Sequence, residues 1–182
     1  MSRMPVLTRE EMDDDQKRVH DAVLKSTGRV GKGPAVGFAY SPGLWEHHDK
    51  SSAVAANSSL SQKQVRITAV VVARHLNAAY PWAAQARQCL DAGVDRAVVD
   101  AINAGETPRF DDAEDAAVYK VASELVRTGT LDDAGFEAAK AAIGFRRMAD
   151  VVGVIGHFTS TALMANLAGA VPADDMPSHL IV

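Results

Sequence analysis

The feature that most constrains the fold is an apolar segment with helical spacing that directly follows a helix-capping motif. Ser61-Gln-Lys-Gln64 has the pattern of a capping box, in which two side chains satisfy backbone N–H groups at the start of a helix. Apolar residues then recur at Val65, Ala69, Val72 and Leu76 with the period of an α-helix. Further apolar residues broaden this stripe over most of the surface, so the sequence predicts a buried helix.

Helix start and stop signals of the same kind divide the rest of the chain, and strand signals are weak. A second capping box, Thr8-Arg-Glu-Glu11, is predicted to open the first helix, and glycines and prolines predict a loop over 27–36. Gly144 is predicted to separate the last two helices. The predicted helices run over about 9–26, 42–57, 62–76, 81–92, 95–103, 112–128, 133–143 and 147–168.

Composition fits one soluble domain. The chain has 182 residues, of which 47% are hydrophobic and 23% charged, and this length is enough to bury a core. We therefore predict a single all-α domain over 1–182, a bundle of seven or eight helices with an N-terminal arm over about 1–8 and an extended tail over about 171–182.

Charge and apolar patterning exclude several partners. The net charge is −4 and no basic face is visible, so we expect no nucleic-acid binding. The longest unbroken apolar runs, such as 69–73 and 151–155, are far shorter than a bilayer span, so we expect no membrane partner. The N-terminal segment lacks the pattern of a secretory signal, and we expect a cytoplasmic protein.

The segment 74–93 concentrates the side chains that can carry chemistry. Arg74 can hold a carboxylate through two hydrogen bonds, and His75 can act as a general base near neutral pH. Arg74 could instead pair with an acidic residue across a subunit contact, and His75 could be a surface histidine favoured by the helix dipole. His157 lies in a later helix rich in small residues, where it either lines a pocket or finds a structural partner.

The following predicted helix supplies one wall of a possible pocket. Gln85 and Cys89 are four residues apart and share a helix face with Trp82, close to Tyr80. The alternative interpretation is that Trp82 and Cys89 belong to the core and that Gln85 satisfies a backbone group. Because Cys89 is the chain's one cysteine, an intrachain disulfide and a Cys-x-x-Cys redox pair are both excluded. No residue pattern predicts a metal site.

These motifs resemble the carboxymuconolactone decarboxylase family, which includes alkylhydroperoxidase D. The family has an apolar helix ending near Ala-Arg, then Tyr-Glu-Trp-x-x-His and a helix ending in Ala-Gly. The matching segments, in the family's order, are Ser41-Pro42, Ala73-Arg74, Tyr80 to Gln85, Ala92-Gly93-Val94 and Gly156 to Asn166. The resemblance implies an alkylhydroperoxidase D-like helical fold and a homo-oligomer, commonly a dimer, trimer or hexamer.

Two departures change what the resemblance implies about activity. Pro81 stands where the family has glutamate, and Gln85 where it has histidine, and neither side chain can move a proton near neutral pH. The peroxidase branch also needs paired cysteines, which this chain lacks.

We therefore expect a lyase-like enzyme of aromatic-compound catabolism that acts on a small carboxylated or lactone-type organic acid by cofactor-free proton transfer or decarboxylation. His75, His157, Gln85 and Tyr80 are the candidate catalytic residues; Arg74, Trp82 and Cys89 are the candidate substrate-binding residues. The alternatives are a ligand-binding member that has lost catalysis and a single-cysteine peroxidase.

Overall fold

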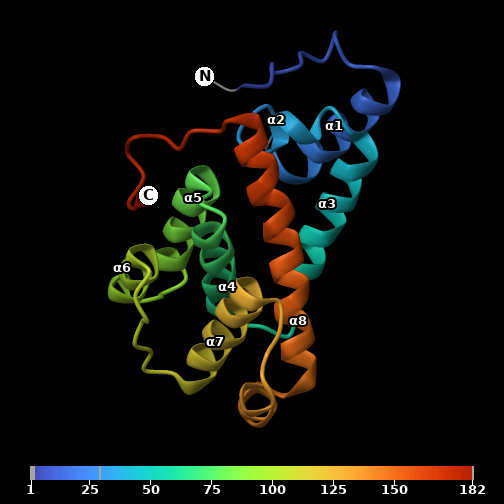
Figure 1. Cartoon of the computed structure of the whole chain (residues 1–182). Helices are drawn as coiled ribbons and strands as arrows, with labels where there is room; N and C mark the ends of the chain where they lie inside the picture. Colours follow the sequence, from blue (N-terminus) through green and yellow to red (C-terminus); the bar gives the residue numbers. More distant parts are fainter. Residues whose placement is uncertain (1–2, 29, 182) are drawn as a thin grey trace.

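The protein is an all-helical bundle built around its last helix. The computed structural model describes residues 3–28 and 30–181, and within these ranges it contains eight helices and no strand. Figure 1 shows the last helix running between α1–α3 on one side and α4–α6 on the other. The helices are α1 (Asp14–Thr27), α2 (Ala35–Phe38), α3 (Pro42–Ala56), α4 (Gln62–His75), α5 (Ala79–Asp91), α6 (Arg96–Ala104), α7 (Ala113–Thr128) and α8 (Asp133–Ala168). The predicted all-α class is thus confirmed.

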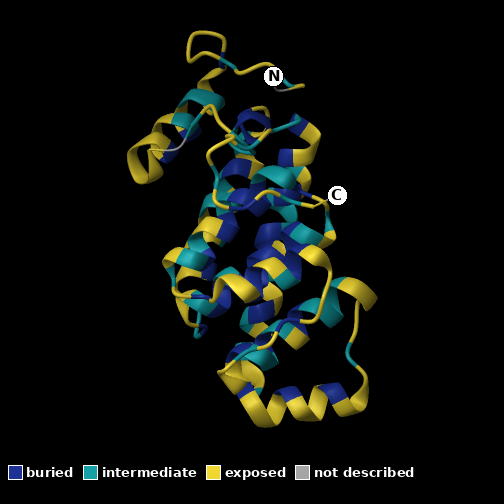
Figure 2. Cartoon of the chain, turned by 90° about the vertical axis from the view of Figure 1, so that its left-hand side faces the viewer, coloured by how far each residue is buried: buried dark blue, intermediate teal, exposed yellow. Residues whose placement is uncertain are grey.

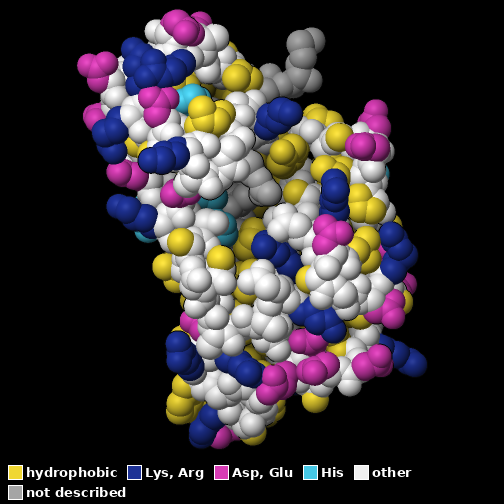
Figure 3. Space-filling view, turned by 180° about the vertical axis from the view of Figure 1, so that it is seen from behind, with side chains coloured by type: hydrophobic (Ala, Val, Ile, Leu, Met, Phe, Trp, Pro, Cys, Tyr) yellow, Lys and Arg dark blue, Asp and Glu magenta, His cyan; other side chains and the backbone are white. Residues whose placement is uncertain are grey.

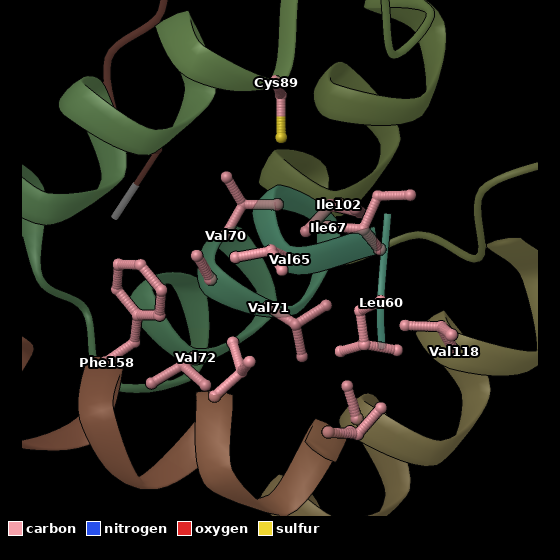
Figure 4. Close-up of a cluster of buried hydrophobic side chains, with 14 of the residues drawn as sticks. Leu60, Val65, Ile67, Val70, Val71, Val72, Cys89, Ile102, Val118 and Phe158 are labelled. Atoms are coloured by element: carbon pink, nitrogen blue, oxygen red, sulfur yellow. The ribbon is translucent and has the colours of Figure 1, made fainter. Parts of the chain in front are cut away.

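The buried helix predicted from the capping box is α4. The Gln64 backbone N–H donates to the Ser61 hydroxyl at 3.2 Å, and the Ser61 N–H donates to the Gln64 side chain at 3.1 Å. Figure 4 shows its valines and Ile67 packed against α8 and α7, and Figure 2 shows that the buried residues gather inside the bundle. The core therefore forms where the sequence is apolar on most of the helix surface.

The first helix begins later than predicted. The Thr8–Glu11 motif closes an isolated turn, with the Thr8 N–H donating to Glu11 Oε2 at 2.8 Å. A capping box at Asp13 and Gln16 opens α1 instead, and Asp14 and Asp15 in its first turn favour this start because they face the positive end of the helix dipole.

Two further boundaries differ from the prediction. The short helix α2 begins inside the segment predicted as a loop, in which Arg29 lies outside the described residues, as do residues 1, 2 and 182 of the predicted arm and tail. The last two predicted helices are joined with no intervening loop: Gly144, at φ 72° and ψ 165°, breaks the helical path within α8 and changes its direction.

The apolar length of α8 was underestimated from the sequence. By length and composition α8 could cross a membrane, a test that core helices of water-soluble proteins also pass. Unbroken apolar runs in the sequence are short, but the length and composition of the whole helix, with its few charges, decide this property. Part of α8 is buried against both halves of the bundle, and the rest exposes apolar side chains, including Val152, Leu163 and Leu167.

Candidate active site

A buried histidine on α8 is held by a serine from α3. His157 Nδ1 lies 2.8 Å from the Ser51 hydroxyl oxygen. A second histidine, His48, packs beside it with ring centroids 4.5 Å apart, and His48 Nε2 lies 2.9 Å from the Thr161 hydroxyl oxygen. Phe38 covers the outer side of the His48 ring. The two imidazoles therefore form one pair between α3 and α8.

The hydroxyl groups fix which ring nitrogens carry hydrogen. Ser51 donates its one hydrogen to the His48 carbonyl at 2.8 Å, and Thr161 donates its own to the His157 carbonyl at 2.9 Å. Each hydroxyl can then only accept from the histidine that it meets, so His157 carries hydrogen on Nδ1 and His48 carries it on Nε2. In the neutral rings, His157 Nε2 and His48 Nδ1 are left as proton acceptors.

Burial keeps both imidazoles neutral. It lowers the pKa of His157 to about 4, and the charge of Arg66, together with that of His48 when it is protonated, acts in the same direction. Burial also lowers the pKa of His48, against the opposing influence of Asp49. At neutral pH the pair therefore offers lone pairs rather than positive charges.

A pair of polar side chains, Arg66 from α4 and Gln85 from α5, lies near His157. Arg66 Nη1 donates to Gln85 Oε1 at 3.1 Å, and the Arg66 charge is close enough to His157 to lower its pKa. Because Gln85 Oε1 is occupied by Arg66, its amide hydrogens remain the groups that Gln85 can offer to a ligand. A guanidinium, an amide and a neutral imidazole can together bind an anion and accept a proton.

These side chains come from four helices that meet at the middle of the molecule. The site combines α3, α4, α5 and α8, which lie far apart in the sequence. Figure 3 shows histidine side chains set back in a furrow on this face, with a Lys or Arg side chain beside them. His157 is buried and His48 is half-buried.

The structure brings together two of the residues that the sequence singled out, His157 and Gln85. Sequence reasoning missed Arg66, Ser51 and His48. Arg66 carried a signal, because it is a charged residue inside the helix predicted to be buried. Ser51 and His48 carried none, because only the packing of α3 on α8 brings them to His157.

The predicted base and anion anchor at the end of α4 lie elsewhere. His75 is exposed and is nine residues beyond Arg66, about 13 Å along the helix axis. Arg74 donates to the Asn103 carbonyl at 2.8 Å and to Asn77 Oδ1 at 3.1 Å, and so it ties the end of α4 to α6.

Most of the predicted pocket wall on α5 is packed into the structure. Trp82 is fully buried, and its indole N–H donates to the Ser178 hydroxyl at 3.2 Å. Tyr80 is half-buried and lies over Gly33, where a side chain would collide with its ring.

Cys89 is also fully buried, and Figure 4 shows its sulfur directed into the aliphatic cluster. Burial raises the pKa of its thiol to about 12, far outweighing the opposing charge of Arg66. Among the described residues, no group of three or more His, Cys, Asp or Glu side chains is arranged to hold a metal ion.

Comparisons with known proteins identify the fold. No family model matches the chain, and neither does any curated protein. Two solved structures are similar: an uncharacterized peroxidase-related protein with an alkylhydroperoxidase AhpD core from Ralstonia eutropha JMP134, and an uncharacterized peroxidase-related protein from Silicibacter sp. TM1040.

The first has a TM-score of 0.76 at 18% identity and covers 96% of this chain and 94% of its own. The second has a TM-score of 0.73 at 17% identity and covers 98% of this chain and 94% of its own. The fold is therefore the AhpD-core fold.

Proposed function

We propose that this protein is an enzyme that moves a proton on a small carboxylated or lactone-type organic acid without a cofactor, and that His157 carries the proton. The observation that supports this best is the position of a buried, neutral imidazole close to the Arg66–Gln85 pair. Its Nδ1 is anchored by Ser51, which leaves Nε2 as the basic atom. Arg66 takes the part of anion anchor that the sequence had assigned to Arg74.

The residues suit chemistry through an enolate. In an isomerisation, His157 Nε2 takes a proton from the carbon beside the substrate carbonyl and returns it to another carbon. In a decarboxylation, the bond to the carboxylate breaks, CO₂ leaves, its bonding electron pair forms the enolate, and His157 passes a solvent proton to carbon. In both cases Arg66 and the Gln85 amide donate hydrogen bonds to the enolate oxygen, where one such donor is worth about 3 kcal/mol in a transition state.

Kinetics on lactone acids tests this proposal. We would measure CO₂ release and exchange of carbon-bound hydrogen with D₂O, using 4-carboxymuconolactone and muconolactone as probes. We expect His157→Gln to lower kcat/KM about a hundredfold or more, as removal of a general base does. Because the pKa of His157 is about 4, the wild-type rate should stay level from neutral pH down to about 5 and fall below it.

His75 is the alternative base, and His47 is an exposed control on α3. Full activity in His157→Gln together with loss of activity in His75→Gln would show that the proton is moved at the end of α4. His47→Gln should behave as wild type.

A ligand-binding protein without turnover is the second candidate. The observation that favours it is that Gln85 and Arg66, which hold each other, do not titrate in a range useful for proton transfer. Saturable binding of both lactones, with neither CO₂ release nor hydrogen exchange, would support it. A single-cysteine peroxidase is the third, and the two similar solved structures are named peroxidase-related, but the buried thiol of Cys89 disfavours it.

We also propose that two copies associate through the exposed apolar face of α8. Val152, Leu163 and Leu167 on this face are 55, 53 and 62% exposed, which is unusual for large aliphatic residues on one helix. Gly153 and Leu167 lie equally far on either side of Ser160, so an antiparallel pairing about Ser160 seats each leucine over the partner's glycine.

Light scattering during gel filtration tests this association. We expect a dimer or a larger oligomer for the wild type at micromolar concentration and a monomer for Leu167→Lys. Val54→Lys, at an exposed position on α3, is the matched control and should leave the mass unchanged. A wild-type monomer that binds phosphatidylcholine–phosphatidylglycerol vesicles would instead make this face a membrane contact and would disprove the pairing.

A further inference from the structure

A hollow lies at the N-terminal end of the bundle and shares no lining residue with the His157 site. It measures about 190 Å³ and is enclosed by the N-terminal arm (residues 3–13), α1, α2, α3 and the segment before α2. Most of the side chains that line it are apolar, including those of Leu7, Met12, Val36 and Trp45, and His20 is the one titratable residue among the residues that line it.

The volume is enough for one substituted ring. Apolar cavities of about 150 Å³ stay free of water and bind benzene. This hollow is somewhat larger, so it can hold a benzene ring with one small substituent. Trp45 lies in its wall with its ring at 71° to that of His20, and Met12 adds a thioether, both of which make favourable contacts with aromatic rings.

A charged chain outside the hollow fixes the imidazole of His20. His20 Nδ1 lies 3.1 Å from Asp21 Oδ1, and Arg9 donates to both Asp21 oxygens at 3.0 and 2.7 Å. Hydrogen bonds from Arg9 and His20 hold the pKa of Asp21 well below its usual range, so this carboxylate stays ionised and accepts the Nδ1 hydrogen. The other ring nitrogen, Nε2, is then left as a hydrogen-bond acceptor on a residue that lines the hollow.

The same contacts hold the arm against the hollow that it lines. The Tyr40 hydroxyl donates to the Pro5 carbonyl at 3.0 Å, which fixes the arm on one side of Val6 and Leu7. Arg9 fixes it on the other side through Asp21, the residue that also orients His20. The carboxylate of Asp21 therefore does two things: it binds Arg9 of the arm and it orients the imidazole of His20.

From this geometry we infer that the hollow is a binding site for a small phenol-type molecule, whose ring lies against Trp45 and whose hydroxyl donates to His20 Nε2. The inference is independent of the chemistry proposed for His157. It selects a ligand with an apolar body and a hydrogen-bond donor, because His20 is the one titratable side chain among mostly apolar side chains that line the hollow.

Calorimetric titration with phenol and with toluene tests the assignment, since the two ligands differ in the hydroxyl group. We expect the wild type to bind phenol about fivefold more tightly than toluene, the value of one net hydrogen bond. In His20→Phe, which keeps a ring but removes the acceptor, the two affinities should become equal. His179→Phe changes an exposed histidine on the tail and should leave the preference for phenol unchanged.

Two further measurements locate the ligand. Ala39→Leu places a larger side chain in the hollow and should abolish binding of both ligands while the circular dichroism spectrum stays that of a folded protein. Crystals soaked in 4-bromophenol should show an anomalous bromine peak between Leu7 and Trp45. The absence of saturable phenol binding up to about 10 mM, a preference for phenol that survives in His20→Phe, or a bromine peak elsewhere would overturn the inference.

Discussion

Burial has opposite chemical consequences for the two most reactive side chains of this protein. Each lies in the interior, where the charged form of an ionisable group is disfavoured. Burial raises the pKa of the Cys89 thiol to about 12. Because the thiolate is the nucleophilic form, the thiol is unreactive at neutral pH. For His157 the neutral form is the base, so burial, which lowers the imidazole pKa to about 4, keeps it ready to accept a proton.

The first prediction concerns Cys89. We expect its thiol to react with Ellman's reagent at least about a hundredfold more slowly than a free thiol in the folded protein, and at the normal rate in urea, because thiolate is the reacting species. Any peroxide consumption by the wild type should be unchanged in Cys89→Ser. Rapid labelling of the folded protein, or loss of peroxide consumption in Cys89→Ser, would contradict this prediction and support the hypothesis of a single-cysteine peroxidase.

At the scale of elements, the C-terminal tail completes the core that α5 begins. After α8 ends, the tail runs across to α5 and ends beside it, as Figure 1 shows. The Ser178 hydroxyl accepts from the Trp82 indole, and Asn103 pairs with the backbone of the tail at both the His179 carbonyl and the Ile181 N–H. Without the tail, these buried polar groups would lose their partners.

We therefore predict the effect of truncating the chain after Ala170. The loss of these three hydrogen bonds should lower the free energy of unfolding by about 3 kcal/mol, and the fluorescence of Trp82 should shift to longer wavelength as water reaches the ring. His179→Ala removes an exposed side chain whose ring lies 3.2 Å from a carbonyl of the tail itself, that of Asp174, and serves as the control. An unchanged unfolding curve would show that the tail merely lies on the surface.

Most of the helices, but less of the site, could be predicted from the sequence. The start of α4 at Ser61 and the break in α8 at Gly144 each depend on a few neighbouring residues, so the sequence pattern at those positions is enough to predict them. The start of α1 was predicted wrongly because two capping motifs follow each other closely, and the acidic first turn at Asp14 and Asp15 favours the second. The grouping of His48, Ser51 and Arg66 around His157 depends on how four helices pack, which no spacing along the chain encodes.

For the whole molecule, the buried histidines link stability to pH. The unfolded chain protonates a histidine below about pH 6.5, whereas folded His157 resists protonation down to about pH 4. The folded state thus loses stability as the pH falls through this window, and above it the two states bind protons equally at this residue. The lowered pKa of His48 adds to the loss in the same direction. Carboxylates with lowered pKa values, such as Asp150, act only at lower pH.

We predict that the free energy of unfolding falls by about 1.4 kcal/mol per pH unit on account of His157 between pH 6.5 and pH 4, on the order of 3 kcal/mol in all. Urea titrations at several pH values would measure it, and His157→Phe should show a shallower slope than wild type. His179→Phe is the control: it removes an exposed histidine and should leave the dependence of the unfolding free energy on pH close to that of wild type. Equal slopes in all three proteins would contradict a buried neutral His157.

The central position of α8 has a consequence for how the protein is made. The group α1–α3 and the group α4–α7 contact each other directly only between α3 and α4 and are joined mainly through α8, which is the last helix among the described residues. Because synthesis proceeds from the N-terminus, both groups of helices leave the ribosome before the surface that they share exists. A nascent chain stalled before residue 145 would hold Ser51, Arg66 and Gln85 but no imidazole from α8, so the site can form only after the segment beyond residue 145 has been made.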